Sequence, residues 1–378
     1  MRLYMHQIHQ HIRILLVAAI LTVVAAVPVL ASTSAAVKES RPAAKAVMKV
    51  MKPIRRPAGI GSGEALPATD IDETLPLPKY PEGARTATGK MQTYAMGEED
   101  TLIDVARYYH LGYIEARAAN LRMDPWTPVP GEEAVIPTFK LLPRAPQKGI
   151  VVNLAQMRLY YFKDPKKEPL TFPIGIGREG LQTPTGETRI VRKAAGPTWF
   201  PTERMREEKP YLPAAVTAGP SNPLGTHALY LGWPTFLIHG SNKPWAIGRR
   251  VSSGCMRMYP EDIVELYKMA PVGTKVTVVD QPILVGWVGD DLYLEANPSK
   301  TQGNDIEIEG EYTVKELDDA LRQMIINAAA VKAEMIDWEI VKKAVEERAG
   351  YPVPIANAKN PPPPEKKSVR VERRFNYN

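Results

Sequence analysis

The sequence VSSGCMRM at residues 251–258 contains Cys255, the only cysteine in this chain of 378 residues. Upstream, residues 236–240 read FLIHG, so His239 follows an apolar run that predicts the end of a strand. A histidine held near a thiol is a common general base for a cysteine nucleophile. The two segments therefore predict a catalytic pair of cysteine and histidine.

Two neighbours of Cys255 favour a catalytic role. Gly254 leaves room for backbone N–H groups to face a ligand. Arg257 places a positive charge near the cysteine, and such a charge lowers the pKa of a thiol. The alternative is a structural cysteine, because free cysteines often pack as small hydrophobic groups.

The region around this pair consists mainly of short β-rich segments separated by glycine and proline turns, a pattern typical of a sandwich or barrel. The expected strands cover residues 150–154, 159–162, 188–192, 228–231, 235–238 and 275–279. One helix is expected at residues 260–269, with Pro260 in its first turn. The long stretch between residues 192 and 221 predicts either a lid over the site or a surface loop.

These motifs resemble the L,D-transpeptidase catalytic domain, a YkuD-like domain of the ErfK/YbiS/YcfS/YnhG type. The family pattern is His-Gly, a loop and then Ser-x-Gly-Cys-x-Arg, which residues 239–257 follow. Residues 149–162 resemble its opening hairpin, and TPTG at residues 183–186 resembles its Thr-Pro-x-Gly turn. The resemblance covers residues 148–280, and it departs at Ser253, where many members carry histidine.

The resemblance implies a mainly β fold in which a β-sandwich catalytic domain places the cysteine beside a groove. In that domain Cys255 would be the nucleophile and His239 the base. The carbonyl of Gly240 would orient the imidazole ring. Backbone N–H groups near Gly254 and Cys255 would stabilise the oxyanion, and Ser253 and Arg257 would complete the binding site for the oxyanion and the substrate.

The implied reaction is acyl transfer on peptidoglycan during cell wall biogenesis, with no cofactor. Cys255 would form a thioester with the third, diamino-acid residue of a tetrapeptide stem and release the terminal D-alanine. The acceptor would be an amine of another stem, giving a 3-3 cross-link, or a lysine of a wall-anchored lipoprotein, a D-amino acid or water. Two other hypotheses remain open: a non-catalytic peptidoglycan-binding protein, and a cysteine peptidase or carboxypeptidase that hydrolyses stem peptides.

Residues 1–31 predict a signal peptide. Arg2 and Arg13 precede an apolar run that ends in small residues, which is the pattern of a secretory signal. An uncleaved anchor is the alternative. No second apolar run is long enough to span a bilayer, so we expect a periplasmic, wall-associated protein with no membrane span after cleavage. Residues 32–90, rich in Lys, Arg, Pro and Ala, predict a linker.

Residues 91–139 predict a small β-α-α-β unit. Thr101 and Asp104 predict the N-terminal cap of its first helix, and a second helix is expected at residues 113–120. The order resembles a LysM module, which implies binding to glycan strands that contain N-acetylglucosamine and a tethering role for the unit. A purely structural role is the alternative.

The C-terminal part predicts a hairpin plus a helical extension at residues 281–352. The hairpin turns at Gly289, and Thr313 with Glu316 predicts a capping box for the first of two helices. Residues 353–378 contain consecutive prolines and many charges, and they predict a disordered tail.

The composition excludes several classes of function. The histidines and the single cysteine lack zinc-ligand spacing, so we expect no metal. Aromatic residues are not interleaved with basic ones as a base-stacking surface would require, so we expect no nucleic acid partner. An exported chain with one cysteine has no disulfide framework, so ordinary hydrophobic cores must stabilise it.

Overall fold

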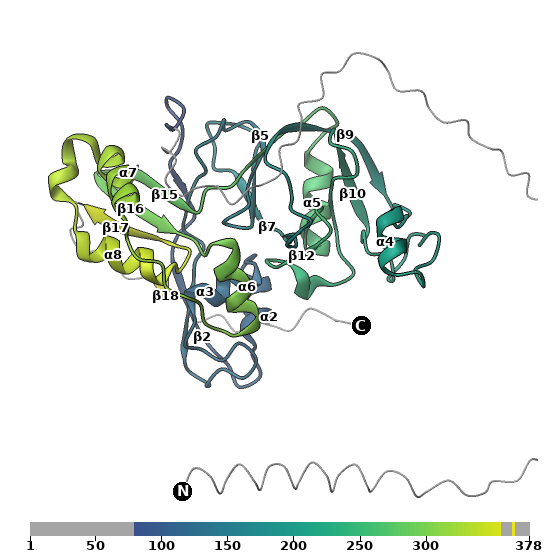
Figure 1. Ribbon diagram of the computed structural model, residues 1–378, viewed down its shortest axis with the longest axis horizontal. Helices are drawn as coiled ribbons and strands as arrows, with labels where there is room; N and C mark the ends of the chain where they lie inside the picture. Colours follow the sequence, from purple (N-terminus) through teal and green to yellow (C-terminus); the bar gives the residue numbers. More distant parts are fainter. Residues whose placement is uncertain (1–78, 357–364, 367–378) are drawn as a thin grey trace, which may run out of the picture. The chain divides into compact units, whose positions relative to one another are not determined.

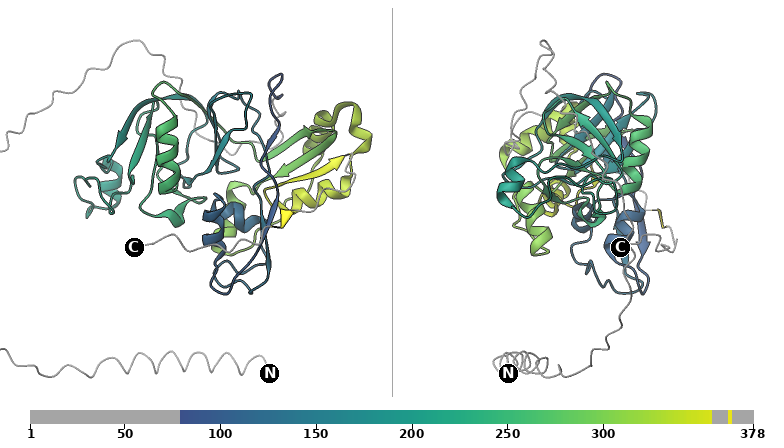
Figure 2. Two further views of the ribbon diagram at one scale, coloured as in Figure 1. Left: turned by 180° about the vertical axis from the view of Figure 1, so that it is seen from behind. Right: turned by 90° about the vertical axis from the view of Figure 1, so that its right-hand side faces the viewer.

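A computed structural model describes residues 79–356 and 365–366 of the chain (Figures 1 and 2). The predicted signal peptide and most of the predicted linker lie outside these residues. Within the described part, no helix is both long enough and apolar enough to cross a bilayer. We refer to residues 91–139 as the module, residues 149–279 as the central unit and residues 281–356 as the extension.

The central unit is built on an eight-stranded sheet in the order β13-β11-β10-β9-β14-β5-β6-β7. Its strands are β5 (Gly149–Asn153), β6 (Arg158–Phe162), β7 (Leu170–Pro173), β9 (Gly186–Ala195), β10 (His227–Leu231), β11 (Leu237–His239), β13 (Met256–Arg257) and β14 (Lys275–Val279). Two neighbouring pairs are parallel, β14 with β5 and β11 with β13, and the other pairs are antiparallel. Each segment that the sequence predicts as a strand is found, with ends shifted by a few residues.

The long strand β9 explains how this sheet encloses a core. Residues 186–189 pair with β14, whereas residues 190–195 pair with β10. Strands on either side of β9 in the sheet contribute to one hydrophobic core, for example through Val152 of β5 and Leu229 of β10. The mainly β character is therefore confirmed. The expected sandwich of two separate sheets is not found. The domain has one continuous mixed sheet around a shared core, because β9 pairs with β14 at one end and with β10 at the other.

Helix α5 (Pro260–Met269) has the bounds that the sequence predicts. Pro260 occupies the first turn, where a missing N–H is tolerated, and Ile263 and Leu266 are fully buried. The helix follows closely on β13, the strand directly after Cys255. Its packing against the core therefore holds the cysteine segment in place (Figure 1).

The module has the predicted β-α-α-β order. It consists of β2 (Gln92–Ala95), α2 (Leu102–Tyr108), α3 (Tyr113–Ala119) and β3 (Glu133–Ile136). The predicted cap is confirmed, because the Thr101 hydroxyl accepts a hydrogen bond from the Asp104 N–H at 3.1 Å. Leu102, Val105 and Ile136 belong to a small core of the module's own.

The module also shares buried contacts with the central unit. Tyr113 and Ile114 of α3 belong to the core of the central unit. The Glu115 carboxylate is buried between the ammonium group of Lys140, 2.8 Å away, and the guanidinium of Arg158, 3.2 Å away. Burial alone would raise the pKa of Glu115, but these two cations hold it below its usual value. A cut near residue 148 would therefore leave Arg158 without Glu115.

We expect Glu115→Gln to lower the free energy of unfolding by about 3–5 kcal/mol, because it leaves two buried cations without their anion. Urea denaturation of the full chain measures the change. Glu179→Gln is the matched control, since Glu179 is exposed on a surface turn. A loss of less than about 1 kcal/mol for Glu115→Gln would contradict the prediction.

The extension is a three-stranded sheet covered by helices, with β16 between β15 and β17 (Figure 1). Its elements are β15 (Ile283–Val288), β16 (Asp291–Ala296), α6 (Lys300–Ile308), α7 (Asp319–Ala329), η2 (Ala330–Met335), α8 (Trp338–Glu347) and β17 (Pro352–Ala356). Leu294 of β16, Ile325 of α7 and Val341 of α8 meet in a separate hydrophobic core. The predicted hairpin with its turn at Gly289 is confirmed.

Three expectations for the segments that flank the module and the central unit are wrong. The capping box predicted at Thr313 does not form; α7 begins later, and the Asp318 carboxylate caps it by accepting from the Leu321 N–H. The predicted disordered tail begins too early, because β17 pairs with β16 and buries Ile355. The rest of that tail lies largely outside the described residues, apart from β18 (Glu365–Lys366), which pairs with β2.

The third error concerns the end of the predicted linker. β1 (Ala87–Thr88) pairs with β4 (Lys140–Leu141), and the Tyr80 hydroxyl donates a hydrogen bond to the carbonyl oxygen of Leu142. The linker therefore ends before residue 80 rather than at residue 90. The composition of this stretch gave no signal, because the pairing partner lies far along the chain.

Candidate active site

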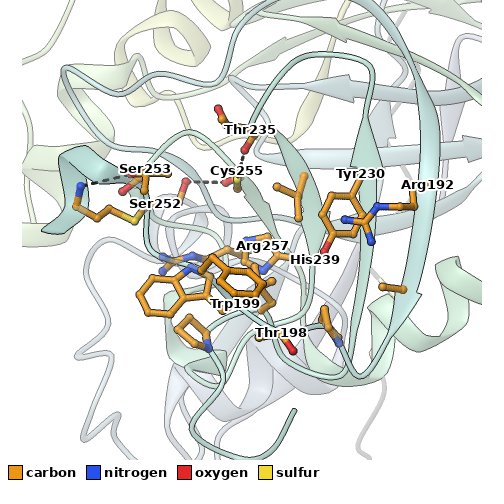
Figure 3. A pocket seen from close by; sticks show the side chains of 18 of the residues that line it. Arg192, Thr198, Trp199, Tyr230, Thr235, His239, Ser252, Ser253, Cys255 and Arg257 are labelled. Carbon is orange, nitrogen blue, oxygen red and sulfur yellow. Dashed lines mark hydrogen bonds between the residues drawn. The ribbon is translucent and has the colours of Figure 1, made fainter. Parts of the chain in front are cut away.

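The parallel pairing of β11 and β13 brings the two predicted catalytic segments together. In this register His239 lies opposite Arg257, and Ile238 lies opposite Met256. Cys255 immediately precedes β13, so the thiol sits at the edge of the sheet near the histidine strand. Figure 3 shows Cys255, His239 and Arg257 around the same pocket.

The pocket has a volume of about 540 Å³. It is lined by Arg192, Ala194, Gly196, Pro197, Thr198, Trp199, Phe200, Thr202, Met205, Pro223, Leu224, Tyr230, Thr235, Leu237, His239, Ser252, Ser253, Cys255 and Arg257. Of the predicted site residues, Ser253, Cys255, His239 and Arg257 therefore line it directly. Gly240 and Gly254 do not line the pocket; the Gly240 carbonyl contacts His239, and Gly254 belongs to the turn before Cys255.

The stretch between residues 192 and 221 forms one wall of the pocket. It contains α4 (Glu203–Glu208), which the sequence did not predict and which Thr202 caps by accepting from the Met205 N–H. Trp199 lies at the pocket, and its backbone pairs with that of Val216 across the loop. The stretch is therefore part of the candidate site.

His239 is positioned by backbone groups, the Gly240 carbonyl and the backbone of Leu224. Its Nδ1 lies 2.6 Å from the carbonyl oxygen of Gly240, which can only accept, so Nδ1 carries the proton and Nε2 is free to act as a base. The imidazole is buried. Burial, with a smaller contribution from the positive charge of Arg257, lowers the pKa of His239 to about 3. The ring is therefore neutral near pH 7.

The thiol of Cys255 is protonated in the resting state. Burial raises the pKa of Cys255, while a backbone hydrogen bond from Leu237 and the charge of Arg257 lower it by smaller amounts. Sγ lies 3.4 Å from the Thr235 carbonyl oxygen, to which the thiol donates. Arg257 thus acts in the expected direction, but burial outweighs it. A protonated thiol and a neutral imidazole line the same pocket, so the thiol must lose its proton as the sulfur attacks.

The turn before Cys255 is held by the side chains of Ser252 and Thr183, which belong to the quoted motifs but were given no role there. The Ser252 hydroxyl donates to the Cys255 carbonyl at 2.6 Å and accepts from the Gly254 N–H at 3.1 Å. The Thr183 hydroxyl donates to the Gly254 carbonyl at 2.8 Å. Gly254 has φ +104°, and an added Cβ would lie 2.8 Å from the Phe236 ring. Only glycine fits this position.

These contacts distinguish the two backbone groups that are expected to bind the oxyanion. The Gly254 N–H is already engaged by Ser252. The Cys255 N–H, in contrast, has no acceptor among the residues that the structure describes. It is therefore the better candidate donor to an oxyanion at the attacked carbonyl.

Backbone hydrogen bonds hold Arg257 in place, but its guanidinium has no anionic partner among the described residues. Its N–H and carbonyl exchange hydrogen bonds with Gly175, both at 2.8 Å. The Nε atom is buried without a hydrogen-bond partner in the described part of the chain. No carboxylate among the described residues pairs with this guanidinium. A buried cation of this kind is suited to an anionic ligand.

The low pKa of His239 predicts an unusual pH profile. Protonation of the base abolishes general-base catalysis, so a depressed pKa moves the acid limb of activity to lower pH. We expect kcat/KM for donor acylation to change by less than about threefold from pH 7 to pH 5. Initial rates across this range measure it, with circular dichroism to verify folding. An acid limb near the ordinary histidine pKa of about 6.5 would contradict the assignment.

The central unit is thus a mixed β domain with a cysteine and a histidine in one pocket. Residues 147–278 match the family model of the L,D-transpeptidase catalytic domain, YkuD. The described residues contain no group of three or more His, Cys, Asp or Glu side chains that could hold a metal ion.

Relatives extend the similarity well beyond this domain. The chain is 35% identical to the probable L,D-transpeptidase YcfS of Escherichia coli K12 over 303 residues, covering 77% of this chain and 90% of the relative. It is 37% identical to the probable L,D-transpeptidase ErfK/SrfK of the same organism, covering 76% of this chain and 93% of the relative. It is also 37% identical to the probable L,D-transpeptidase YbiS of that organism, covering 74% of this chain and 91% of the relative. The chain belongs to the L,D-transpeptidase family.

The solved structure of an L,D-transpeptidase from Mycobacterium smegmatis is 20% identical over 40% of this chain and 71% of that chain, with a TM-score of 0.28. The E. coli relatives match more than twice the length of the YkuD domain. The match to them therefore includes parts of the chain that flank the central unit.

Proposed function

We propose that the protein is a peptidoglycan L,D-transpeptidase that works through a thioester at Cys255. The observation that carries the proposal is the meeting of Cys255, His239 and the uncompensated Arg257 in one pocket. A thiol beside a neutral base is competent for nucleophilic attack on an amide. The family match supports transpeptidation as the outcome.

The first half of the reaction forms the acyl-enzyme. Sγ of Cys255 attacks the carbonyl carbon of the third residue of a tetrapeptide stem, and the thiol proton passes to Nε2 of His239. The oxyanion accepts a hydrogen bond from the Cys255 N–H. The C–N bond then breaks, His239 returns the proton to the departing amine, and D-alanine leaves.

The second half reverses these steps with a new amine. The acceptor loses a proton to His239 as it attacks the thioester, and the thiol is restored. With a side-chain amine of another stem, the product is a 3-3 cross-link. A lysine of a wall-anchored lipoprotein would give an anchored lipoprotein, and water would give hydrolysis.

Mass spectrometry of muropeptides tests this function. Purified protein is incubated with wall material rich in tetrapeptide stems, and we expect 3-3 linked dimers together with free D-alanine. Release of D-alanine with only tripeptide products would identify a hydrolase instead. Unchanged muropeptides would favour a non-catalytic wall protein.

We further propose that the protein acts in the periplasm and that the module binds glycan strands. The loops at residues 97–101 and 123–129 adjoin, since the Leu102 N–H donates to the Pro125 carbonyl at 2.9 Å. Beside this contact Trp126 is 59% exposed, which offers an aromatic face to a sugar ring. The basic residues and the apolar run within residues 1–31, the pattern of a secretory signal, support export of the chain.

We expect Trp126→Ala to reduce sedimentation of the full chain with purified sacculi by about threefold to tenfold, through loss of a stacking contact. Because the module shares buried contacts with the central unit, the test uses point variants instead of fragments. Tyr211→Ala is the control, an exposed aromatic residue outside the module. Equal sedimentation of Trp126→Ala and the parent protein would assign the module a structural role.

A further inference from the structure

The module contacts the chain on both sides of the nucleophile. We call residues 107–114, which run from the end of α2 into the first turn of α3, the docking segment. Residues 247–262, which contain Cys255, are the nucleophile segment. The docking segment meets the nucleophile segment at both of its ends. A unit that only tethers an enzyme to its substrate needs no such contacts, because a linker supplies the same effective concentration.

At the upstream end, the first turn of α3 donates two hydrogen bonds to the nucleophile segment. The Tyr113 N–H donates to the Ile247 carbonyl at 3.2 Å. The Ile114 N–H donates to the Gly248 carbonyl at 3.1 Å. The first N–H groups of a helix have no partner within it, so these carbonyls satisfy them. The two backbones touch here, since a Cβ added to Gly112 would lie 2.6 Å from the Cα of Gly248.

Arg249 fixes the same end through its side chain. Its guanidinium lies 3.5 Å from the centroid of the Tyr113 ring. One of its nitrogens lies 2.8 Å from a carboxylate oxygen of Glu307 on α6, and its Nε donates to the Trp245 carbonyl at 2.9 Å. The module and the extension therefore hold this loop together.

The upstream end leads directly to the turn at the nucleophile. After Gly248 and Arg249 comes β12 (Arg250–Ser252), which pairs with β8 (Ile176–Gly177). Ser252 ends this strand, and its hydroxyl donates to the Cys255 carbonyl at 2.6 Å. A displacement of the loop at the module is therefore passed along a short strand to the turn that carries the sulfur.

At the downstream end, the docking segment holds the start of α5. Tyr259 is the N-cap residue of this helix, and its hydroxyl donates to the Leu111 carbonyl at 3.1 Å. The Arg107 guanidinium donates to both carboxylate oxygens of Glu261, at 2.9 and 2.8 Å. Because α5 follows closely on β13, these contacts fix the chain on the far side of Cys255.

We propose that the module positions the nucleophile. By holding the nucleophile segment at both ends, the docking segment fixes Cys255 relative to His239. Gly112 is a positioning residue at the upstream end and Arg107 at the downstream end. Acylation of a small donor that contains no sugar then depends on the module, a role that tethering does not supply. The inference rests on the proposed function, in which the geometry of the thiol and its base sets the rate.

Gly112→Ala tests the upstream contact without straining the backbone, because Gly112 has φ −82°, which alanine adopts freely. The added Cβ must displace Gly248. With a soluble tetrapeptide donor, we expect kcat for D-alanine release to fall by about 10-fold to 100-fold, while KM changes by less than about threefold. Gly303→Ala is the matched control in α6, since its Cβ would meet Ile114 at an ordinary 3.9 Å. It should change neither constant.

Alkylation of Cys255 by iodoacetamide gives a second readout that needs no turnover. Cys255 is the only cysteine of the chain, so the mass of the intact protein reports its reaction. A loosened segment admits water to the thiol, which lowers the pKa of Cys255 toward its ordinary value and raises the thiolate fraction. We expect Gly112→Ala to be alkylated about threefold to tenfold faster than the parent at pH 7, although it is acylated more slowly.

Val341→Ala separates positioning from a general loss of stability. Val341 is fully buried in the separate core of the extension, so its truncation weakens the fold away from the site. Under conditions in which circular dichroism shows each variant to be folded, its kcat and alkylation rate should stay within about twofold of the parent. Equal changes in Val341→Ala and Gly112→Ala would overturn the inference. Parent values in Gly112→Ala would overturn it as well.

Arg107→Gln applies the same test at the downstream end, and it decides the outcome if Gly112→Ala does not fold. Both readouts should move in the directions given for Gly112→Ala. Arg107→Lys should recover part of kcat, because an ammonium keeps the charge but not the paired hydrogen bonds. Parent values in Arg107→Gln would overturn the inference at this end.

Alkylation also separates this inference from the proposed function. If the parent enzyme turns over no donor, the proposed chemistry fails and alkylation alone decides on the role of the module. Faster alkylation of Gly112→Ala, with parent rates in Gly303→Ala and Val341→Ala, then supports positioning of the thiol. An unchanged rate in Gly112→Ala overturns it.

Discussion

Cys255→Ala is expected to abolish acyl transfer to below detection while changing the free energy of unfolding by less than about 1 kcal/mol. The reaction has no route without the sulfur, because every step forms or breaks the thioester. The fold is expected to survive, since Cys255 is only half-buried as a residue and its sulfur makes only weak hydrogen bonds, to the Thr235 carbonyl and with the backbone of Leu237. Release of D-alanine and thermal unfolding measure the two effects.

Cys255→Ser is the matched comparison for this change. It keeps the size and the hydrogen bonding of the side chain but replaces the thiol by a much weaker acid. We expect it to be nearly as inactive as Cys255→Ala, because the neutral His239 would have to activate an alcohol. Transfer at the parent rate in either variant would exclude Cys255 as the nucleophile.

The catalytic pair could be predicted from sequence because its signals are local. A short apolar run precedes His239, which was placed correctly at a strand end, and the glycine turn before Cys255 was recognised, although the short strand β13 after it was not predicted. Helix α5 was predicted to the residue, because Pro260 marks its start and its apolar positions recur at helical spacing. These features need no knowledge of the rest of the chain.

The supporting contacts could not be predicted, because they join residues far apart in sequence. Glu115 meets Arg158 across two units, and Thr183 supports the turn at Gly254. Nothing in the local sequence of Thr183 or Ser252 indicates a partner. The same reason explains β17, whose prolines favour a tail until pairing with β16 satisfies its backbone.

The protonation states of Cys255 and His239 could not be predicted from the sequence either, because they depend on burial in the folded pocket. The sequence correctly placed Arg257 beside Cys255, but the balance between its charge and the burial of the thiol is a property of the folded pocket. Burial prevails for both members of the pair. It raises the pKa of Cys255 and lowers that of His239, so the neutral forms dominate before substrate binds.

His239→Ala is expected to slow donor acylation by about 10²–10⁴-fold, the usual contribution of a positioned general base. The loss should fall on kcat/KM for acylation, because the resting thiol is protonated and requires a proton acceptor as it attacks. Rapid-mixing measurements of acyl-enzyme formation, followed by intact-protein mass spectrometry, give this rate directly. Raising the pH should restore part of the activity of the variant, since the thiol then ionises without assistance.

His227→Ala is the matched control for the base. His227 lies on the neighbouring strand β10 and packs against the Tyr267 ring at 4.5 Å, but it does not line the pocket. Its replacement should change the acylation rate by less than about threefold. If His227→Ala were the more damaging change, the base would be the wrong histidine. The hydrogen bond from His239 to the Gly240 carbonyl would then be a structural contact, since orienting Nε2 toward the thiol would serve no catalytic purpose.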